Sequence, residues 1–362
     1  MAAARGREGR VRMDRAISRR RFALAAGAAA LISALPRPAM AQSPTRLKMI
    51  LNWRYQGPQG WFFLAEDKGY FREEGLEIVM DQGNGSGAAV GAVASGSYDI
   101  GFGDINALIQ LVARSQAGAA TPLAISALYN RPPFTIAVKA DGPIKTPKDL
   151  EGRTIGGPAN DGALKLFPAF AKLAGIDAGK VSITNMQPNL REQMLQRGQV
   201  DGVFGFVNTI AFSAKLVGID PHKDFRFINF GDYGMDLYSN AIIASRKLAT
   251  ENPNALKGLL RAIDRGLKDT LKDNDAAIEA VARREPLINK AIEKERLVAT
   301  LASEMSHPEA AKIGIGDIDD ARFKKSIAVV VEADGLPRLP APDEVFSRAF
   351  LPPLADRITK LT

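Results

Sequence analysis

The sequence predicts an α/β protein of two lobes with mainly parallel sheets. Strands and helices alternate at short spacing from residue 46 onward, and 362 residues are too many for one ordinary core. An eleven-residue pattern also occurs twice: "GSYDIGFGDIN" (96–106) and "GQVDGVFGFVN" (198–208) share G-x-x-D-x-x-x-G-x-x-N. We interpret the two copies as equivalent strand-to-helix units of two related halves.

Short apolar runs predict the strands, and helical periodicity follows most of them. In the first half we expect strands at 47–51, 76–80, 98–102 and 123–128, and helices at 61–71, 87–94 and 105–114. In the second half we expect strands at 154–157, 181–184, 202–206 and 225–229, and helices at 161–174, 189–197 and 208–217. From residue 252 to about 304 the pattern is almost wholly helical, with a single apolar face that predicts core packing.

The first 41 residues have the features of an export signal. A basic stretch that ends in "SRRRFAL" (18–24) precedes a 14-residue apolar run (22–35) and the small-x-small site "AMA" (39–41). The arginines before Phe22 resemble a twin-arginine signal, and an ordinary Sec signal is the alternative. We expect cleavage near Ala41 and a periplasmic protein, because the apolar run is too short for a confident spanning helix.

The charge distribution argues against nucleic-acid binding. The formal net charge is +8, but residues 1–41 hold nine arginines against Glu8 and Asp14, so the remainder of the chain carries only +1. A nucleic-acid footprint would lie on the folded domain. The chain has no cysteine, and its two histidines, His222 and His307, lie far apart in polar turns, so neither thiol catalysis nor a metal site is expected.

Candidate ligand-binding residues lie where the predicted strands end, because ligands of open α/β sheets bind beyond the carboxyl ends of the strands. Trp53 is placed to stack on a flat solute, and Phe206 could close on it from the other lobe. Trp61 lies inside a helical pattern and is expected in the core. The polar candidates, of which Asp104 and Asp161 carry a charge, are Asn52, Gln56, Gln59, Asp104, Asn106, Asn160, Asp161, Asn208 and Tyr238.

Two glycine-rich loops, "GNGSG" (83–87) and "GGPANDG" (156–162), lead into helices. Free N–H groups at such helix starts favour an anionic or acceptor-rich ligand group, although glycines that only permit tight turns explain the loops equally well. Asn160 and Asp161 have the alternative role of an N-cap pair. Neither loop is a full dinucleotide or phosphate motif, and no G-x-S-x-G occurs, so we expect binding and not catalysis.

The segment "AEDKGYFREEGL" (65–76), after the Asn-Trp pair at 52–53, resembles ABC-transporter solute-binding proteins of the nitrate/sulfonate/taurine and thiamine-pyrimidine-precursor group. The similarity continues through "SGSYDIGFGD", "DLEGRTIGGP" and "VDGVFGF". The resemblance implies a type II periplasmic-binding-protein fold with two hinge crossings, near "PPFTIAV" (132–138) and "NAIIAS" (240–245). Lobe 1 would take residues 46–134 and 245–362, and lobe 2 would take residues 135–244.

The resemblance also implies a function and its partners. It implies a protein that delivers a small flat or anionic solute to an inner-membrane permease. Nothing in the sequence suggests an obligate oligomer, and we expect a monomer without a cofactor. Asn52-Trp53 favours a pyrimidine-like thiamine precursor, whereas sulfonate, nitrate and taurine stay open because Gln59 stands where many of these proteins carry a histidine. The group's enzyme alternative is a thiamine pyrimidine synthase, which uses pyridoxal phosphate on a lysine. That enzyme has a cysteine-rich run, and this chain has no cysteine.

Overall fold

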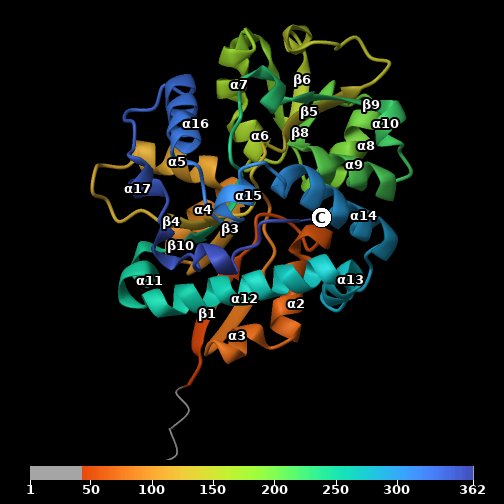
Figure 1. The fold of residues 1–362 in the computed structure, drawn as a ribbon. Helices are drawn as coiled ribbons and strands as arrows, with labels where there is room; N and C mark the ends of the chain where they lie inside the picture. The colour runs from red at the N-terminus through yellow and green to blue at the C-terminus, as the bar shows by residue number, and fades with distance from the viewer. Residues whose placement is uncertain (1–42, 362) are drawn as a thin grey trace, which may run out of the picture. The chain divides into compact units, whose positions relative to one another are not determined.

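The computed structural model describes residues 43–361 of the chain. The predicted signal peptide, residues 1–41, lies outside the described residues. Two five-stranded sheets and the helices around them make up the part that the structure describes (Figure 1). No helix within residues 43–361 combines the length and the apolar composition that a bilayer crossing requires.

The first sheet has the strand order β2-β1-β3-β10-β4. Strand β1 pairs in parallel with both β2 and β3, whereas β10 is antiparallel to its two neighbours β3 and β4. The strands span Thr45–Ile50 (β1), Leu76–Asp81 (β2), Ile100–Asp104 (β3), Leu123–Ala127 (β4) and Asn240–Ala244 (β10).

The second sheet repeats this arrangement with the order β7-β6-β8-β5-β9. Strand β6 pairs in parallel with β7 and β8, and β5 is the antiparallel strand between β8 and β9. The strands span Phe134–Lys139 (β5), Thr154–Gly157 (β6), Ser182–Asn185 (β7), Gly202–Phe206 (β8) and Phe225–Asn229 (β9). Four strands of each sheet run in one direction, which confirms the predicted α/β class and its mainly parallel sheets.

The chain passes between the two sheets twice, at residues 128–133 and 230–239. The predicted boundary of lobe 2 at residue 244 does not coincide with the end of the second sheet. The five buried residues of β10 pair instead with β3 and β4 of the first sheet. The run at 240–244 was expected to be a crossing. It is instead an inserted strand whose backbone groups find partners on both sides.

Helices of the first half follow its strands. The predicted helix at 61–71 is divided in two, because Gly69 has a φ of 78°, which ends one helix and starts the next. The helical elements are the 3₁₀-helix η1 (Gly57–Gln59), α2 (Gly60–Asp67), α3 (Tyr70–Glu73), α4 (Ser86–Ala94) and α5 (Ile105–Arg114).

Helices of the second half are shorter, and Pro168 coincides with a break in the predicted helix at 161–174. The α-helices are α6 (Gly162–Lys165), α7 (Phe167–Leu173), α8 (Arg191–Gln196), α9 (Val207–Leu216) and α10 (Pro221–Asp224). Four 3₁₀-helices accompany them: η2 (Pro147–Leu150), η3 (Ala178–Lys180), η4 (Pro188–Leu190) and η5 (Phe230–Tyr233).

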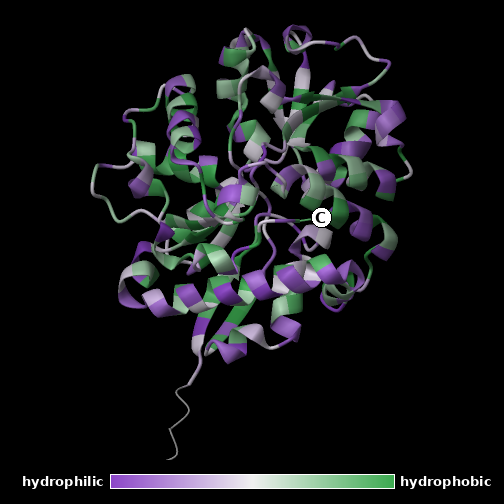
Figure 2. Cartoon of the chain, in the orientation of Figure 1, coloured by the Kyte–Doolittle hydropathy of each residue, from purple (hydrophilic) through white to green (hydrophobic). Residues whose placement is uncertain are grey.

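The C-terminal segment is helical, as predicted. Its longest helix, α12, packs against α2, and hydrophobic residues recur along it between hydrophilic ones (Figure 2). The helices are α11 (Arg246–Glu251), α12 (Pro253–Lys272), α13 (Asn274–Ala282), α14 (Lys290–Thr300), the π-helix η6 (Leu301–Met305), α15 (Ala310–Ile313), α16 (Asp320–Ala333), α17 (Pro342–Val345), and the 3₁₀-helices η7 (Arg348–Phe350) and η8 (Leu354–Asp356).

Two of these C-terminal helices contact both halves. Helix α14 packs against η1 of the first half and α9 of the second, and α16 packs against α5 and α7 in the same way. The C-terminal segment therefore holds the two halves against each other on two sides of the crossings.

Candidate ligand-binding site

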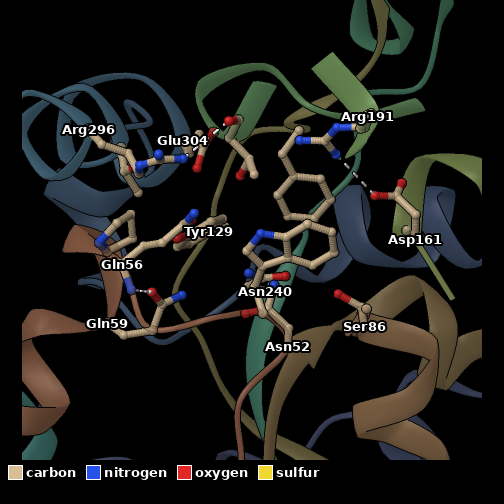
Figure 3. A pocket seen from close by; sticks show the side chains of 17 residues that line it. Asn52, Gln56, Gln59, Ser86, Tyr129, Asp161, Arg191, Asn240, Arg296 and Glu304 are labelled. Atoms are coloured by element: carbon tan, nitrogen blue, oxygen red, sulfur yellow. Dashed lines mark hydrogen bonds and ion pairs between the residues drawn. The ribbon is translucent and has the colours of Figure 1, made fainter. Parts of the chain in front are cut away.

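A small cavity is enclosed by residues of both halves and of the C-terminal helices (Figure 3). The cavity has a volume of about 30 Å³, which is room for about two water molecules. The first half contributes Asn52, Trp53, Gln56, Pro58, Gln59, Gly85, Ser86, Tyr129 and, from β10, Asn240. The second half and α14–η6 contribute Asp161, Gly162, Arg191, Phe206, Thr209, Arg296, Thr300 and Glu304.

The structure brings six of the candidates predicted from the sequence to this cavity. They follow β1 or β6 or end β8, in line with the strand-end argument: Asn52, Trp53, Gln56, Gln59, Asp161 and Phe206. Gln59 also accepts a hydrogen bond from the backbone N–H of Gln56 at 3.0 Å, which fixes the turn before α2.

Trp53 and Trp61 have different surroundings. Trp53 lines the cavity and is 8% exposed, and the guanidinium carbon of Arg191 lies 5.6 Å from the centre of its ring. Trp61 is fully buried and packs edge-to-face on Phe62 at 5.5 Å, so its predicted place in the core is confirmed. Tyr55, near Trp53 in sequence, turns away and donates to the carbonyl of Met80 at 2.7 Å.

Asp161 begins helix α6 and faces Arg191. Its Oδ1 accepts from the N–H groups of Ala163 and Leu164 at 2.9 and 3.3 Å, so the N-cap interpretation of Asp161 is confirmed. Its Oδ2 lies 3.8 Å from Arg191 Nη1 (Figure 3). Burial raises the pKa of Asp161, and the neighbouring guanidinium of Arg191 opposes that rise.

Arg191 is a cavity residue that the sequence did not indicate. It is 1% exposed, and its Nε and Nη2 donate to Glu192 Oε1 at 2.9 and 2.6 Å. A third donor, Nη1, reaches the carbonyl of Phe204 on β8 at 3.3 Å. The guanidinium is thus bound on one side by its own half and presents its face to Trp53 of the other.

A second buried arginine, Arg296, comes from helix α14. Its Nη2 donates to Glu293 Oε1 at 3.1 Å and its Nη1 donates to the carbonyl of Thr209 on α9 at 3.1 Å. Glu293 in turn accepts from the N–H of Gly57 at 2.7 Å. This chain of contacts runs from η1 through α14 to α9 and so connects the two halves beside the cavity.

Glu304 reaches the cavity from the π-helix η6. Burial raises the pKa of this carboxyl to about 8, although contacts with Asn208 and the charge of Arg296 act in the opposite direction. Its Oε1 has no hydrogen-bond partner among residues 43–361. Nothing in the sequence distinguished Glu304 from the other charged residues of the helical C-terminal segment.

Two more cavity residues were missed, one in the first crossing and one in a strand that was expected to be a crossing. Tyr129 follows β4, and Asn240 is the first residue of β10. The backbone carbonyl of Asn240 accepts from the N–H groups of Leu128 and Tyr129 at 2.9 and 3.0 Å. Burial raises the pKa of the Tyr129 hydroxyl well above its ordinary value. A predicted strand at 240–244 would have placed Asn240 at a strand end.

Five predicted site residues do not line the cavity. Asp104 caps α5: its Oδ1 accepts from the backbone and side-chain N–H groups of Asn106 at 3.1 and 2.8 Å, and burial raises its pKa to about 7. Asn106 also donates to the carbonyl of Tyr238 at 2.7 Å. Asp104 lies next to the cavity wall, because a Cβ placed on Gly162, which lines the cavity, would lie 3.5 Å from Asp104 Oδ2.

The other three candidates form contacts elsewhere. The Tyr238 hydroxyl accepts from the N–H of Asp319 at 2.8 Å, and Asn208 donates to Ser303 Oγ at 2.9 Å. The carbonyl of Asn160 accepts from the N–H of Gly87 at 3.2 Å, which joins the two glycine-rich loops across the halves. None of these three side chains is among those that enclose the cavity in the described part of the chain.

Pyridoxal phosphate does not fit the described lining, because the residues around the cavity include no lysine that could hold it and no histidine. Residues 43–361 also contain no group of three or more acidic or histidine side chains arranged to hold a metal ion.

The two repeated sheets with an enclosed cavity between them are the fold of the periplasmic binding proteins. The periplasmic aliphatic sulphonate binding protein SsuA from Escherichia coli superposes with a TM-score of 0.60 at 18% identity, covering 86% of this chain and 100% of that one. The chain belongs to the family described as NMT1/THI5 like, whose pattern it matches over residues 60–277, more than half of its length.

Relatives with described roles fall into two groups. The riboflavin-binding protein RibY of Chloroflexus aurantiacus is 25% identical over 223 residues, which span 60% of this chain and only 60% of RibY. The 4-amino-5-hydroxymethyl-2-methylpyrimidine phosphate synthase of Legionella pneumophila is 24% identical over 265 residues, 73% of this chain and 81% of the synthase. The resemblance found in the sequence is therefore confirmed at the level of the family.

Proposed function

We propose that this chain is the monomeric solute-binding component of a bacterial ABC importer, and that it captures a small flat solute in the cavity. A pyrimidine-like thiamine precursor is favoured over sulfonate, nitrate and taurine. The observation that carries the proposal is the buried Trp53 on the wall of a cavity that both halves enclose. An aromatic wall with a few fixed polar groups is the usual form of a small-molecule site.

The proposed working cycle is an opening and closing of two lobes. Lobe 1 would be built on the first sheet, including β10, and lobe 2 on the second sheet from β5 to β9. The cavity as it stands has room for about two waters, so the solute would enter an open form and the halves would then close on it less tightly than here, with both crossings (128–133 and 230–239) acting as hinges. The closed, loaded form would then dock on an inner-membrane permease after export to the periplasm.

A thermal-shift screen of the chain from Gln42 tests this function. The panel would contain pyrimidines, riboflavin, aromatic carboxylates, sulfonates, taurine and nitrate. A ligand at 100 times its Kd raises the free energy of unfolding by about 2.7 kcal/mol, which is a shift of a few degrees in Tm. Mass spectrometry of small molecules released from protein purified from the periplasm is the second measurement. The proposal fails if no compound shifts Tm and no solute is released.

The second candidate is an enzyme like the synthase relatives. It predicts an aldimine between pyridoxal phosphate and a lysine, with visible absorbance. Because the cavity lining among the described residues has no lysine, we expect the purified protein to stay colourless after incubation with pyridoxal phosphate. A stable absorbance band that borohydride reduction fixes to a lysine would favour the enzyme.

A further inference from the structure

The two arginines of the cavity are both neutralised by carboxylates. Arg191 is bound by Glu192 at 2.6 Å and faces Asp161 at 3.8 Å, and Arg296 is bound by Glu293 at 3.1 Å. All five of these groups are buried. Even without Glu304, three carboxylates thus surround two guanidinium groups. Within the described residues the cavity therefore has no surplus positive charge for an anionic solute.

The glycine-rich loops, which could have bound an anion, use several of their N–H groups within the protein. The side chain of Asp161 occupies the N-terminus of α6, and the N–H of Gly87 at the start of α4 donates to the carbonyl of Asn160. The N–H of Gly85 donates to the carbonyl of Asn52 at 2.8 Å. At these positions the chain's own acceptors take the place that the sequence left open for an anion.

The cavity instead contains hydrogen-bond acceptors that are not satisfied. Asn52 Oδ1, Asn240 Oδ1 and Glu304 Oε1 are buried and have no hydrogen-bond partner among residues 43–361. All three residues line the cavity. Buried polar atoms in proteins are almost always paired, so a solute that carries N–H donors would complete this site.

The backbone around Glu304 fixes the position of its side chain. Helix α14 ends at Thr300 and continues as one π-helical turn, which changes the direction of the side chains that follow, and such turns occur often at functional sites. The carbonyl of Glu304 accepts from the N–H of Arg131 in the first crossing at 2.9 Å. Its side chain, in a residue that is 5% exposed, borders the cavity.

Burial of Glu304 favours the neutral acid, whereas the groups around it act in the opposite direction. Asn208 and Thr300 contact its carboxyl, the charge of Arg296 on α14 is compensated by Glu293, and Tyr129 faces it from the end of β4. On the hinge side, the crevice that Glu304 borders is also lined by the titratable or charged residues Arg131, Asp232, Asp236 and His307. Burial outweighs these charges and raises the pKa of Glu304 to about 8.

We propose that Glu304 determines the specificity of the site: its carboxylic acid donates to a ring nitrogen and accepts from an adjacent N–H of an uncharged nitrogen heterocycle, while sulfonates and nitrate are excluded. This inference rests on the proposed binding function. A protonated carboxyl offers one donor and one acceptor side by side, which matches the N–C–NH₂ edge of an aminopyrimidine. The two asparagine oxygens are available for further N–H groups of the same ring.

Isothermal titration at pH 6, 7, 8 and 9 tests the inference, with 4-aminopyrimidine and riboflavin as uncharged probes and ethanesulfonate and nitrate as anions. The wild-type chain should bind an uncharged probe and lose about tenfold in affinity per pH unit above pH 8, as Glu304 ionises. Glu304→Gln keeps a donor and an acceptor and should give a flat pH profile. Glu304→Leu should bind at least about tenfold more weakly at pH 7.

Glu279→Gln is the matched control, because Glu279 pairs with Lys290 at the surface of the same C-terminal segment and neither residue lines the cavity. It should bind as the wild type does at every pH, and Tm at pH 6 checks that all variants fold. Tighter binding of ethanesulfonate or nitrate than of both heterocycles would overturn the role of Glu304 and leave the importer function standing. The role of Glu304 would also be overturned if the affinity of Glu304→Gln depended on pH in the same way as that of the wild type. No binding of any probe, with no co-purified solute, would overturn both.

Discussion

The guanidinium carbon of Arg191 lies 5.6 Å from the centre of the Trp53 ring, and the two residues come from different halves of the molecule. Both side chains line the inner cavity, and both also line an outer crevice with a free volume of about 380 Å³. The pair therefore stands between the two spaces and joins the halves by a cation–π contact.

Trp53→Ala should weaken solute binding by about 1–3 kcal/mol, because it removes the aromatic wall of the cavity and its contact with Arg191. Titration with the compound found in the screen measures the loss. Tyr55→Phe is a suitable control, since the Tyr55 hydroxyl binds the carbonyl of Met80 outside the inner cavity. Equal affinities of Trp53→Ala and the wild type would show that the ring does not contact the solute.

Arg191→Met should lower the free energy of unfolding by about 3–5 kcal/mol, because it leaves the buried carboxylates of Glu192 and Asp161 without their common partner. Urea denaturation at pH 7 measures the change. The double variant Arg191→Met/Glu192→Gln should recover part of the loss, because one of the uncompensated charges is removed. A single variant as stable as the wild type would mean that the pair contributes nothing.

The stability of the solute-free protein should decrease as the pH rises from about 5 to 8. Burial raises the pKa of Asp104 and Asp264 to about 7 and that of Glu304 to about 8. A carboxyl whose pKa is raised in the folded state stabilises the fold fully below its ordinary pKa, and this contribution is lost as the pH approaches the raised value. Each group gives a slope of up to about 1.4 kcal/mol per pH unit.

Thermal or urea unfolding at several pH values measures this dependence. Asp264→Asn should reduce the slope without changing solute affinity, because Asp264 lies on α12 beside Lys268 and Arg357, away from the cavity. Glu304→Gln should reduce the slope and also change the pH dependence of binding. A stability that is constant or rises between pH 5 and 8 would contradict the raised pKa values.

Gly57→Ala should destabilise the fold by about 1–3 kcal/mol. A Cβ at Gly57 would lie 2.1 Å from the backbone carbonyl oxygen of Glu293, so η1 and α14 would have to separate. Gly91→Ala on α4 is the matched control, since a Cβ there meets nothing within 4 Å and favours the helix. Urea midpoints of the two variants should therefore move in opposite directions.

Most of the fold could be predicted from local pattern. All eight predicted strands exist within two residues of the expected bounds, because each is a short apolar run between turns. The two strands that were missed, β5 and β10, were interpreted as crossings. Both are antiparallel insertions into otherwise parallel sheets, and the choice between a crossing and an inserted strand depends on distant pairing partners that local sequence does not contain.

The site was predictable only where it follows strand ends. Asn52, Trp53 and Phe206 were found by that argument, whereas Arg296 and Glu304 come from a helical segment. A charged residue in a helical pattern is usually exposed, and the pattern around Glu304 gives no sign of the π-helical turn. Its burial results from packing of the C-terminal segment against both halves, which is a tertiary property.

Helix α14 presents Glu293 to one half, where it accepts from Gly57, and Arg296 to the other, where it donates to Thr209. These two hydrogen bonds act as a clasp across the two halves, and the ion pair of Lys215 with Glu295 at 2.6 Å reinforces it at the surface. If opening separates α14 from α9, the clasp releases a buried guanidinium and a surface ion pair into water. Salt screens the charges of the exposed guanidinium and of the separated ion pair. The rate of solute release would therefore depend on the ionic strength of the compartment in which the protein works.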